Sequence, residues 1–457
     1  MAKLKRALGL WEVTLCGIGV IFGAGIYVLI GKAAGAAGNA VWISFAISAL
    51  IAGITGLSYA ELSSKFPKSG AEYVFSFKAF GRRVGFMTGW LIFIAGVFSA
   101  ATVALGFAGY INDAFGFPPM LMAVALIGAL SVLLLYGVKL SAWTGILTTL
   151  IESVGLVIII LIGIPFFGKV DLLEMASGFG GVLSAAALIF FAFIGFEDIT
   201  RMSEETKNPR RTIPKALILA IIISTVVYVL VAVSAVSIAG WQALGNSAAP
   251  MKDVVSAVLG PEAGTVMSVI ALFSAFNTVL LILMATSRML YVMASAGTLP
   301  RRIGWVHPKR RTPWVAIFVV GIIGAALLAF GEISFIAGIT DFAIFVTFMI
   351  INLSLIKLRY SNDRTKGSFR VPISIGRIPV LPVVGVAVSL MMIYYLGVSV
   401  IVLGAVTAAL GVGAYLLTKD VAVREKELAL VHNMEHAMAD AEKKIHKIGI
   451  ALRYKKT

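Results

Sequence analysis

The chain has 457 residues, of which 60% are apolar and only 13% charged, and its formal net charge is +16. A soluble domain could not bury that much apolar surface, so the composition indicates a polytopic α-helical membrane protein. The single cysteine, Cys16, excludes an internal disulfide and the usual multi-cysteine metal site. We expect neither a metal nor another cofactor.

Runs of about 20 apolar residues predict twelve transmembrane helices. They lie at roughly 8–30, 41–62, 84–112, 119–138, 143–167, 182–203, 213–240, 264–295, 313–330, 336–358, 377–396 and 398–418. If the N-terminus is cytoplasmic, only Lys32, Lys169 and Lys252 of the 38 basic residues fall outside. Basic residues mark the cytoplasmic side. The net charge is therefore a topology signal and not a nucleic-acid site, and both termini are expected in the cytoplasm of a protein of the cell membrane.

The first run contains Gly17, Gly19, Gly23 and Gly25, and each glycine weakens a helix by about 1 kcal/mol relative to alanine. A broken backbone is tolerated in a bilayer only where it is buried in protein or lines a water-filled cavity. Discontinuous helices form the substrate sites of many secondary transporters. The alternative is close helix packing, because Gly19-x-x-x-Gly23 fits the GxxxG pattern.

The fifth run carries one acidic residue, Glu152, about midway along an otherwise uncharged segment. A carboxylate at this depth is expensive and indicates a functional site. Glu152 could carry a proton, since burial favours the neutral acid. It could instead help to bind a cation or form a helix–helix hydrogen bond.

The sixth run contains a second predicted break near Gly195, followed at once by Glu197 and Asp198, which are candidates for an inner gate. The two breaks are five spans apart, and this odd spacing gives two halves of opposite orientation, as an inverted repeat requires. We expect one repeat over about 8–167, a second over about 182–358, and two additional helices over 377–418.

A polar cluster, an acid near the cytoplasmic boundary and the C-terminal segment give three further predictions. Ser274, Asn277 and Thr278 form a polar cluster in the eighth run that could bind sodium or make interhelical hydrogen bonds. Glu61, near the cytoplasmic boundary, is expected in a solvated gate ion pair. In the segment 419–457, a heptad-like apolar pattern predicts a cytoplasmic amphipathic helix over roughly 421–450, outside the transport path.

Several short motifs occur at separated positions along the chain, and their order and spacing together are highly specific. They are Gly17-Ile-Gly-x-x-x-Gly-x-Gly-Ile, Tyr59-Ala-Glu-Leu-Ser-Ser-x-Phe-Pro67-x-Ser-Gly70, Gly89-Trp90, Phe191-Ala-Phe-Ile-Gly-Phe-Glu197, Asn208-Pro-x-Arg-x-Ile-Pro214 and Ser287-Arg288. Together they resemble the amino acid–polyamine–organocation (APC) family of transporters, which have the LeuT-like fold. The resemblance covers nearly all of the chain up to about residue 418, with Phe22 at a position where the family usually has Ile.

The resemblance implies an amino acid site between the two breaks. The half-helix that begins near Gly25 offers N–H groups and a positive dipole end to the substrate carboxylate. The half-helix that ends near Ile194 offers free carbonyls to the ammonium group. Carried over by motif position, the carboxylate side consists of Ile21, Ala24 and Gly25, and the ammonium side of Phe191, Ala192 and Ile194. Phe193 is the aromatic residue expected to close the site from outside.

The implied function is secondary active import of amino acids by alternating access, without enzymatic chemistry. Neutral substrates are favoured because Ala95 stands where some cationic-amino-acid relatives have an acid. Proton coupling is favoured, although several proton-coupled relatives carry Lys at the position of Glu152, so the charge type is reversed. Cationic amino acids or polyamines, exchange, sodium coupling and an amino acid sensor with the same fold stay open as alternatives.

Overall fold

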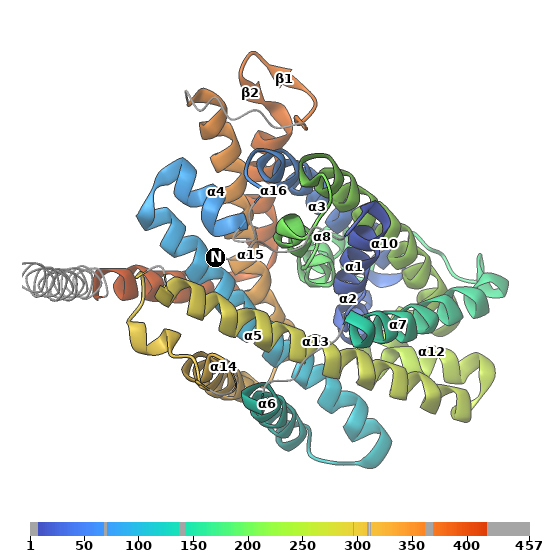
Figure 1. The fold of residues 1–457 in the computed structure, drawn as a ribbon. Helices are drawn as coiled ribbons and strands as arrows, with labels where there is room; N and C mark the ends of the chain where they lie inside the picture. The colour runs from blue at the N-terminus through green and yellow to red at the C-terminus, as the bar shows by residue number, and fades with distance from the viewer. Residues whose placement is uncertain are drawn as a thin grey trace, which may run out of the picture.

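The computed structural model describes residues 8–67, 71–136, 142–295, 297–308, 310, 312–361 and 369–417, and the chain is almost entirely helical (Figure 1). Nine helices in this described part are long and apolar enough to cross a membrane. Three shorter apolar helices, Leu10–Ile21, Trp314–Phe330 and Val380–Tyr395, accompany them. The prediction of an all-helical, polytopic membrane protein agrees with this architecture. The predicted helix over 421–450 lies outside the described residues.

The helices follow one another with short connections. The first group is α1 (Leu10–Ile21), α2 (Gly25–Ala37), α3 (Val41–Lys65), α4 (Ala71–Phe80), α5 (Arg82–Phe115), α6 (Pro119–Tyr136) and α7 (Ala142–Gly163). The second is α8 (Gly178–Ile189), α9 (Asp198–Arg201), α10 (Pro209–Ala239), α11 (Trp241–Asn246), α12 (Pro250–Leu259), α13 (Pro261–Ser295), α14 (Trp314–Leu327) and α15 (Ile333–Tyr360). After α15, the strands β1 (Ser374–Ile375) and β2 (Ile378–Pro379) pair antiparallel before α16 (Val380–Tyr395) and a last helix, Val398–Leu417. Short 3₁₀ segments interrupt the chain at η1 (Gly38–Ala40), η2 (Ile164–Phe166), η3 (Phe190–Phe193), η4 (Met202–Glu204), η5 (Arg301–Gly304) and η6 (Leu328–Phe330).

Both predicted helix breaks are present. Helix α1 ends at Ile21 and α2 begins at Gly25, and α8 passes through η3 before α9 begins at Asp198. Gly195 in the second break has φ of +113°, a conformation that residues with a Cβ rarely adopt. A Cβ there would also lie 2.6 Å from Cγ1 of Val20. Gly23, Gly25 and Gly195 therefore lie at the backbone interruptions, as the sequence indicated. Gly17 and Gly19 lie inside α1, where an added Cβ would meet Ile199 and Thr149, so at these two positions the alternative of close helix packing applies.

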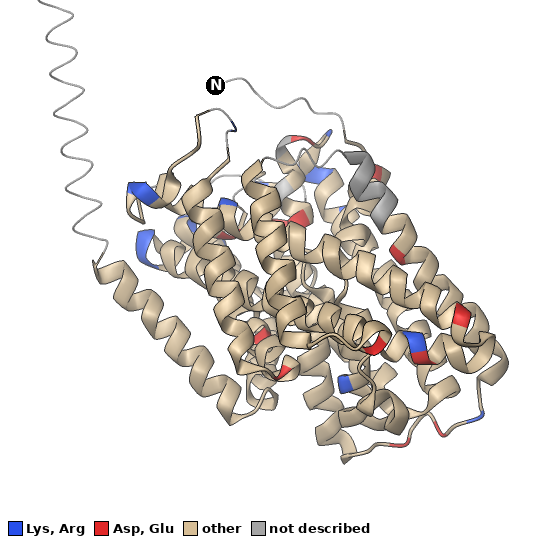
Figure 2. Cartoon of the chain, turned by 90° about the horizontal axis from the view of Figure 1, so that it is seen from below, with Lys and Arg blue, Asp and Glu red and all other residues tan. Residues whose placement is uncertain are grey.

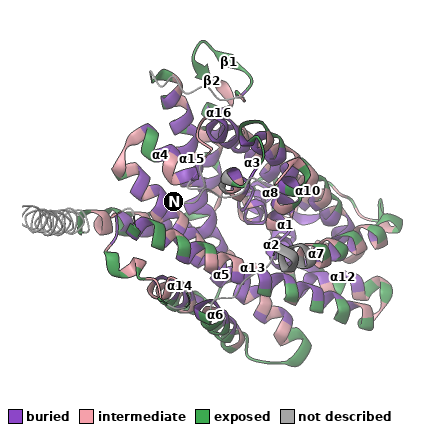
Figure 3. Ribbon diagram, viewed as in Figure 1, coloured by how far each residue is buried: buried purple, intermediate pink, exposed green. Residues whose placement is uncertain are grey.

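Helices from distant parts of the chain pack together. α3 packs along α10, and α5 packs along both α13 and α15. Figure 3 shows mostly buried residues along the interior helices α3, α8 and α15, and many exposed ones along α6 and α14. Exposed apolar side chains on outer helices suit contact with lipid. The mostly buried helices α2 and α8 are thus placed in the interior, and α1 buries one face against it, so the interrupted backbone is shielded.

Charged residues are distributed unevenly along the helices. Most Lys and Arg segments lie toward one end of the bundle, the upper end in Figure 2, and few lie toward the opposite end. Lys65 in the last turn of α3 and Arg359 in the last turn of α15 lie close together, since both contact Glu61. This clustering is the spatial counterpart of the asymmetry in the sequence.

The ion pair expected at Glu61 is present, but it is buried. Nε of Arg359 donates to Oε1 of Glu61 at 3.1 Å and Nη2 donates to Oε2, while the two side chains are only 4% and 2% exposed. Lys65 adds a contact of 3.1 Å, and the Val371 N–H donates to Glu61 at 2.8 Å. The expectation of a solvated pair is therefore wrong. The ion pair links α15 to α3, and the chain after α15 contacts the same carboxylate through the N–H of Val371.

Candidate substrate-binding site

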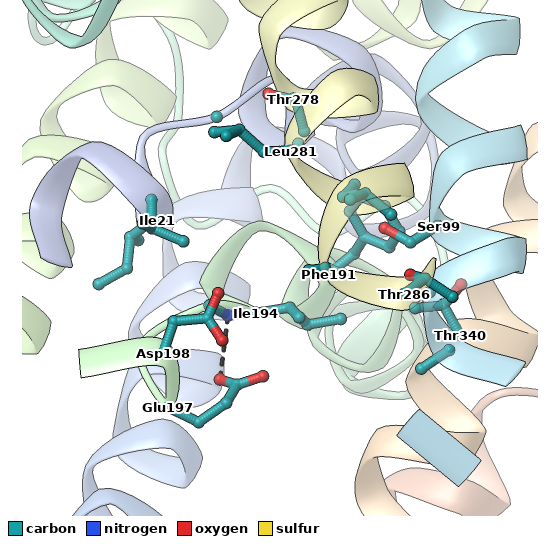
Figure 4. Close-up of a pocket in the computed structure, with 18 of the residues that line it drawn as sticks. Ile21, Ser99, Phe191, Ile194, Glu197, Asp198, Thr278, Leu281, Thr286 and Thr340 are labelled. Carbon is teal, nitrogen blue, oxygen red and sulfur yellow. Dashed lines mark hydrogen bonds between the residues drawn. The ribbon is translucent and has the colours of Figure 1, made fainter. Parts of the chain in front are cut away.

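A pocket of about 260 Å³ lies between the two helix breaks. Its walls come from both breaks and from α5, α13 and α15, and Figure 4 shows the side chains that surround it. Of the seven predicted substrate-binding residues, five line the pocket: Ile21, Gly25, Phe191, Ala192 and Ile194. The pocket is small and mainly apolar, which suits a ligand recognised by a few convergent polar groups.

The two breaks touch at Gly25. A Cβ added to Gly25 would lie 2.9 Å from Cα of Ala192 and 3.3 Å from Cδ1 of Phe191. A separation under 3.0 Å from a backbone atom leaves no room for a side chain. Glycine at this position therefore allows the start of α2 to approach the backbone of η3.

Ala24, the residue before Gly25, does not line the pocket. Its N–H donates to Oγ1 of Thr278 on α13 at 3.0 Å, so a side chain satisfies one of the N–H groups at the start of α2. Thr278 itself does line the pocket. One member of the predicted polar cluster is thereby placed at the first break.

The hydroxyl group of Tyr228 on α10 lies close to a backbone carbonyl of each helix break. It lies 2.5 Å from the Ile21 carbonyl oxygen and 3.1 Å from that of Ala192. The tyrosine is fully buried, and Phe193 packs against it with 5.2 Å between ring centroids. Phe193 therefore faces α10 in this conformation and does not line the pocket. The sequence pattern gave no indication of Tyr228, because a tyrosine in a long apolar helix is unremarkable in isolation.

Glu197 and Asp198 lie together at one end of the pocket (Figure 4). Oε2 of Glu197 accepts a hydrogen bond of 3.0 Å from the Gly195 N–H, which caps the backbone of the break. The hydroxyl groups of Ser99 and Thr340 gather on another side of the pocket. The two predicted gate candidates thus adjoin the pocket, and one of them supports the bent backbone directly.

Glu152 is buried on α7, with 1% of its surface exposed, and does not line the pocket. Its backbone carbonyl accepts a hydrogen bond of 2.6 Å from the Tyr27 hydroxyl on α2. Ser274 and Asn277 of α13 lie beside its carboxyl group, which makes no hydrogen bond within the described part of the chain. The tertiary structure therefore brings Glu152 next to Ser274 and Asn277, two members of the predicted polar cluster. The third member, Thr278, instead contacts the first helix break.

Asp341 on α15 is a buried acid that is not among the site residues predicted from the sequence. It is 0% exposed and follows Thr340, which lines the pocket. The criterion that singled out Glu152, a charged residue at membrane depth, would have found it in the predicted span 336–358. Among the described residues, no group of three or more His, Cys, Asp or Glu side chains could hold a metal ion.

These features define a polytopic helical membrane protein with a small central pocket between two interrupted helices. The chain belongs to the amino acid permease family, since the family model described as "Amino acid permease" matches residues 8–415. This confirms the resemblance to APC transporters. The family and the similar proteins below are transporters and not enzymes.

Similar proteins span most of the chain. A branched-chain amino acid permease of Bacillus subtilis is 29% identical, over 91% of this chain and 93% of its own length. An uncharacterized transporter of Mycobacterium tuberculosis is 31% identical, over 93% of this chain and 94% of its own length. The human cationic amino acid transporter 4 is 27% identical, over 80% of this chain and 62% of its own length.

Proposed function

We propose that this protein is a secondary active transporter that imports amino acids across the cell membrane by alternating access. The fold we propose is LeuT-like, with twelve membrane spans, inverted repeats over about 8–167 and 182–358, and two additional helices over 377–418. The basic end of the bundle is cytoplasmic, with both termini on that side. Residues 419–457 form a cytoplasmic amphipathic helix outside the transport path.

The observation that carries this proposal is the contact between the two helix breaks at the pocket. Backbone N–H groups at the start of α2 are suited to bind a carboxylate, since the positive end of a helix dipole lies there. Backbone carbonyls of η3 are suited to accept from an ammonium group. Gly25 and Ala192 hold these two groups of opposite polarity next to each other. Ile21, Phe191 and Ile194 of the pocket wall complete the backbone site in this conformation. Ala24, whose N–H is donated to Thr278, joins the site when that N–H turns to the substrate, and Phe193 closes it from outside when it turns toward the pocket.

A neutral amino acid is the substrate that the pocket favours. Ala95 of α5 lines the pocket and offers no acid to a cationic side chain. Glu197 already accepts from the backbone of the break. Cationic amino acids are the second candidate, because Glu197 and Asp198 are the charged residues in the pocket wall and one similar protein is named a cationic amino acid transporter.

Proton coupling through Glu152 is the favoured energy source. The carboxyl group is buried beside Ser274 and Asn277, and the backbone carbonyl of the same residue accepts a hydrogen bond from Tyr27 of α2. A change in its protonation would therefore act on the half-helix that binds the substrate carboxylate. If sodium is the coupling ion, the same oxygen-bearing side chains with Thr278 become its candidate ligands.

Counterflow in proteoliposomes tests the transport function. The purified protein is reconstituted with unlabelled leucine, alanine, lysine or putrescine inside, and labelled substrate is added outside. Transient accumulation of label with leucine or alanine supports a neutral amino acid transporter, and accumulation with lysine alone supports the cationic alternative. Saturable binding without counterflow would indicate a sensor. Protein-free liposomes and the Gly25→Val variant provide the baseline.

A further inference from the structure

Asp341 is a buried acid for which the proposed transport mechanism has no role. Its side chain is 0% exposed, and neither carboxyl oxygen has a hydrogen-bond partner in the described part of the chain. Buried polar groups in native proteins are nearly always hydrogen-bonded, so each exception calls for an explanation. Acids inside membrane-spanning helices are rare and usually mark an ion or proton pathway.

The surrounding contacts place Asp341 beside the second helix break. Thr340 precedes it in the sequence, Ile344 lies one turn farther along α15, and both line the pocket. Phe345, also one turn away, packs on Phe190 of η3 with 4.8 Å between ring centroids. Asn352 lies eleven residues away, about three turns and on nearly the same face, and contacts Thr55 of α3. The face of α15 that carries Asp341 is therefore the face packed against η3 and α3.

No described basic group compensates the charge of Asp341. α15 packs against α3, α4, α5, α8, α16, β2 and η3, and its Gly338 and Phe342 contact the last helix. α8, β2 and η3 contain no ionisable residue. The ionisable residues of the other elements, with those of α15 itself, are Tyr59, Glu61, Lys65, Glu72, Tyr73, Lys78, Arg82, Arg83, Tyr110, Asp113, Lys357, Arg359, Tyr360, Tyr394, Tyr395 and Tyr415. None of them makes a hydrogen bond or ion pair with Asp341.

An isolated carboxylate in such surroundings is strongly disfavoured, and the group is expected to take up a proton instead. α15 also extends to a second cavity of about 340 Å³, lined by Glu332 and Ile333 at its N-terminus. Eight residues of helix, about 12 Å, separate Ile333 from Asp341. The acid thus lies at the level of the central pocket, flanked on α15 by Thr340 and Ile344 of its wall, and one helical segment away from the second cavity.

We propose that Asp341 is a second proton-binding carboxyl group of the transport cycle, distinct from Glu152. It holds a proton while α15 is packed on η3, as in this conformation, and releases it when substrate binding or the transport movement loosens that packing. Figure 1 shows α7, which carries Glu152, and α15 on opposite sides of α1 and α8. Each helix break would then have its own buried acid. This inference rests on the proposed transport function.

The decisive variant is Asp341→Asn, which preserves size and polarity but cannot exchange a proton. Asp341→Glu retains a carboxyl group. Ser389→Ala on α16 is the matched control, because Ser389 is also fully buried with an unpartnered oxygen but has no proton to exchange at neutral pH. Full-length protein is reconstituted for counterflow and for the proton-to-substrate ratio during transport. Protonated carboxyl groups are measured by infrared difference spectroscopy on substrate addition.

We expect Asp341→Asn to retain counterflow while its proton-to-substrate ratio falls by one, and Glu152→Gln combined with it to lower the ratio further. Ser389→Ala should match the wild type. The wild-type infrared spectrum should contain a protonated-carboxyl band that responds to substrate, shifts in Asp341→Glu and is absent in Asp341→Asn.

An unchanged ratio in an Asp341→Asn variant that still exchanges substrate would overturn the proposal. If that variant loses counterflow, the infrared spectra decide between the outcomes. A substrate-responsive carboxyl band in the wild type that shifts in Asp341→Glu supports the proposal. A wild-type spectrum without such a band refutes the proposal. A wild-type protein that exchanges amino acids but moves no protons refutes the role of Asp341 and leaves the transport function intact. Absence of counterflow in the wild type counts against the transport function itself.

Discussion

Gly25 and Ala192 meet backbone to backbone, so closely that a Cβ on Gly25 would lie 2.9 Å from Cα of Ala192. This contact joins the start of α2 to η3, two segments more than 160 residues apart in the sequence. It brings the positive end of one half-helix next to the carbonyls of another.

Gly25→Val should abolish substrate binding, because the branched side chain cannot enter the space between α2 and η3. Gly25→Ala should weaken binding less, since only one carbon is added. Binding to detergent-solubilised protein measures the effect, and a monodisperse elution profile shows that the fold survives. Gly128→Val on α6 is the matched control, because a Cβ at Gly128 has nothing within 4 Å. Wild-type affinity in Gly25→Val would mean that the contact only packs the helices.

Tyr228→Phe should lower substrate affinity by roughly threefold to tenfold. The change removes the hydroxyl that lies near the carbonyls of both Ile21 and Ala192, and one such hydrogen bond contributes about 0.5–1.5 kcal/mol. Titration of binding in the purified variant gives the measurement. Tyr394→Phe serves as the control, since Tyr394 is 74% exposed. An unchanged affinity would show that the hydroxyl does not position the two breaks for the substrate.

Glu152→Gln should lower accumulation driven by a pH gradient, and abolish it if Glu152 is the sole coupling acid, while leaving exchange at least partly intact, because glutamine keeps the shape of the side chain but carries no proton. Uptake into proteoliposomes with an acidic exterior, compared with counterflow at equal pH, separates the two activities. If accumulation by the variant is still driven fully by the pH gradient, Glu152 has no part in the mechanism. Sodium-dependent uptake by the wild type would instead point to an ion site at Ser274, Asn277 and Thr278.

Glu61→Gln should destabilise the protein by about 3–5 kcal/mol, because it leaves the buried guanidinium of Arg359 without its counter-charge. Thermal unfolding of the solubilised variant, followed by tryptophan fluorescence, gives the measurement as a lower midpoint. Asp113→Asn is the matched control. Its partner is Lys252, and these side chains are 29% and 25% exposed, so the expected loss is below about 1 kcal/mol. Equal midpoints for the two variants would contradict the assignment of a buried, structural ion pair.

The sequence by itself determined those features that depend only on residues close together in the chain. Long apolar runs predicted membrane-spanning helices, and the glycines from Gly17 to Gly25 and at Gly195 predicted the interruptions, because a glycine acts on the backbone at its own position. Glu152 was found for the same reason: an acid in an apolar run is visible without knowledge of the fold. Asp341 was equally visible by that criterion.

Only the tertiary structure decided which of these groups meet. Thr278 reaches the N–H of Ala24, 254 residues away, while its neighbours in the same cluster face Glu152 on α7. Tyr228 acquires its position between the two breaks only when α10 packs behind them. The burial of Glu61 likewise depends on a chain segment about 300 residues later. Such contacts follow from the packing of whole helices against one another, which the local pattern of apolar and polar residues does not specify.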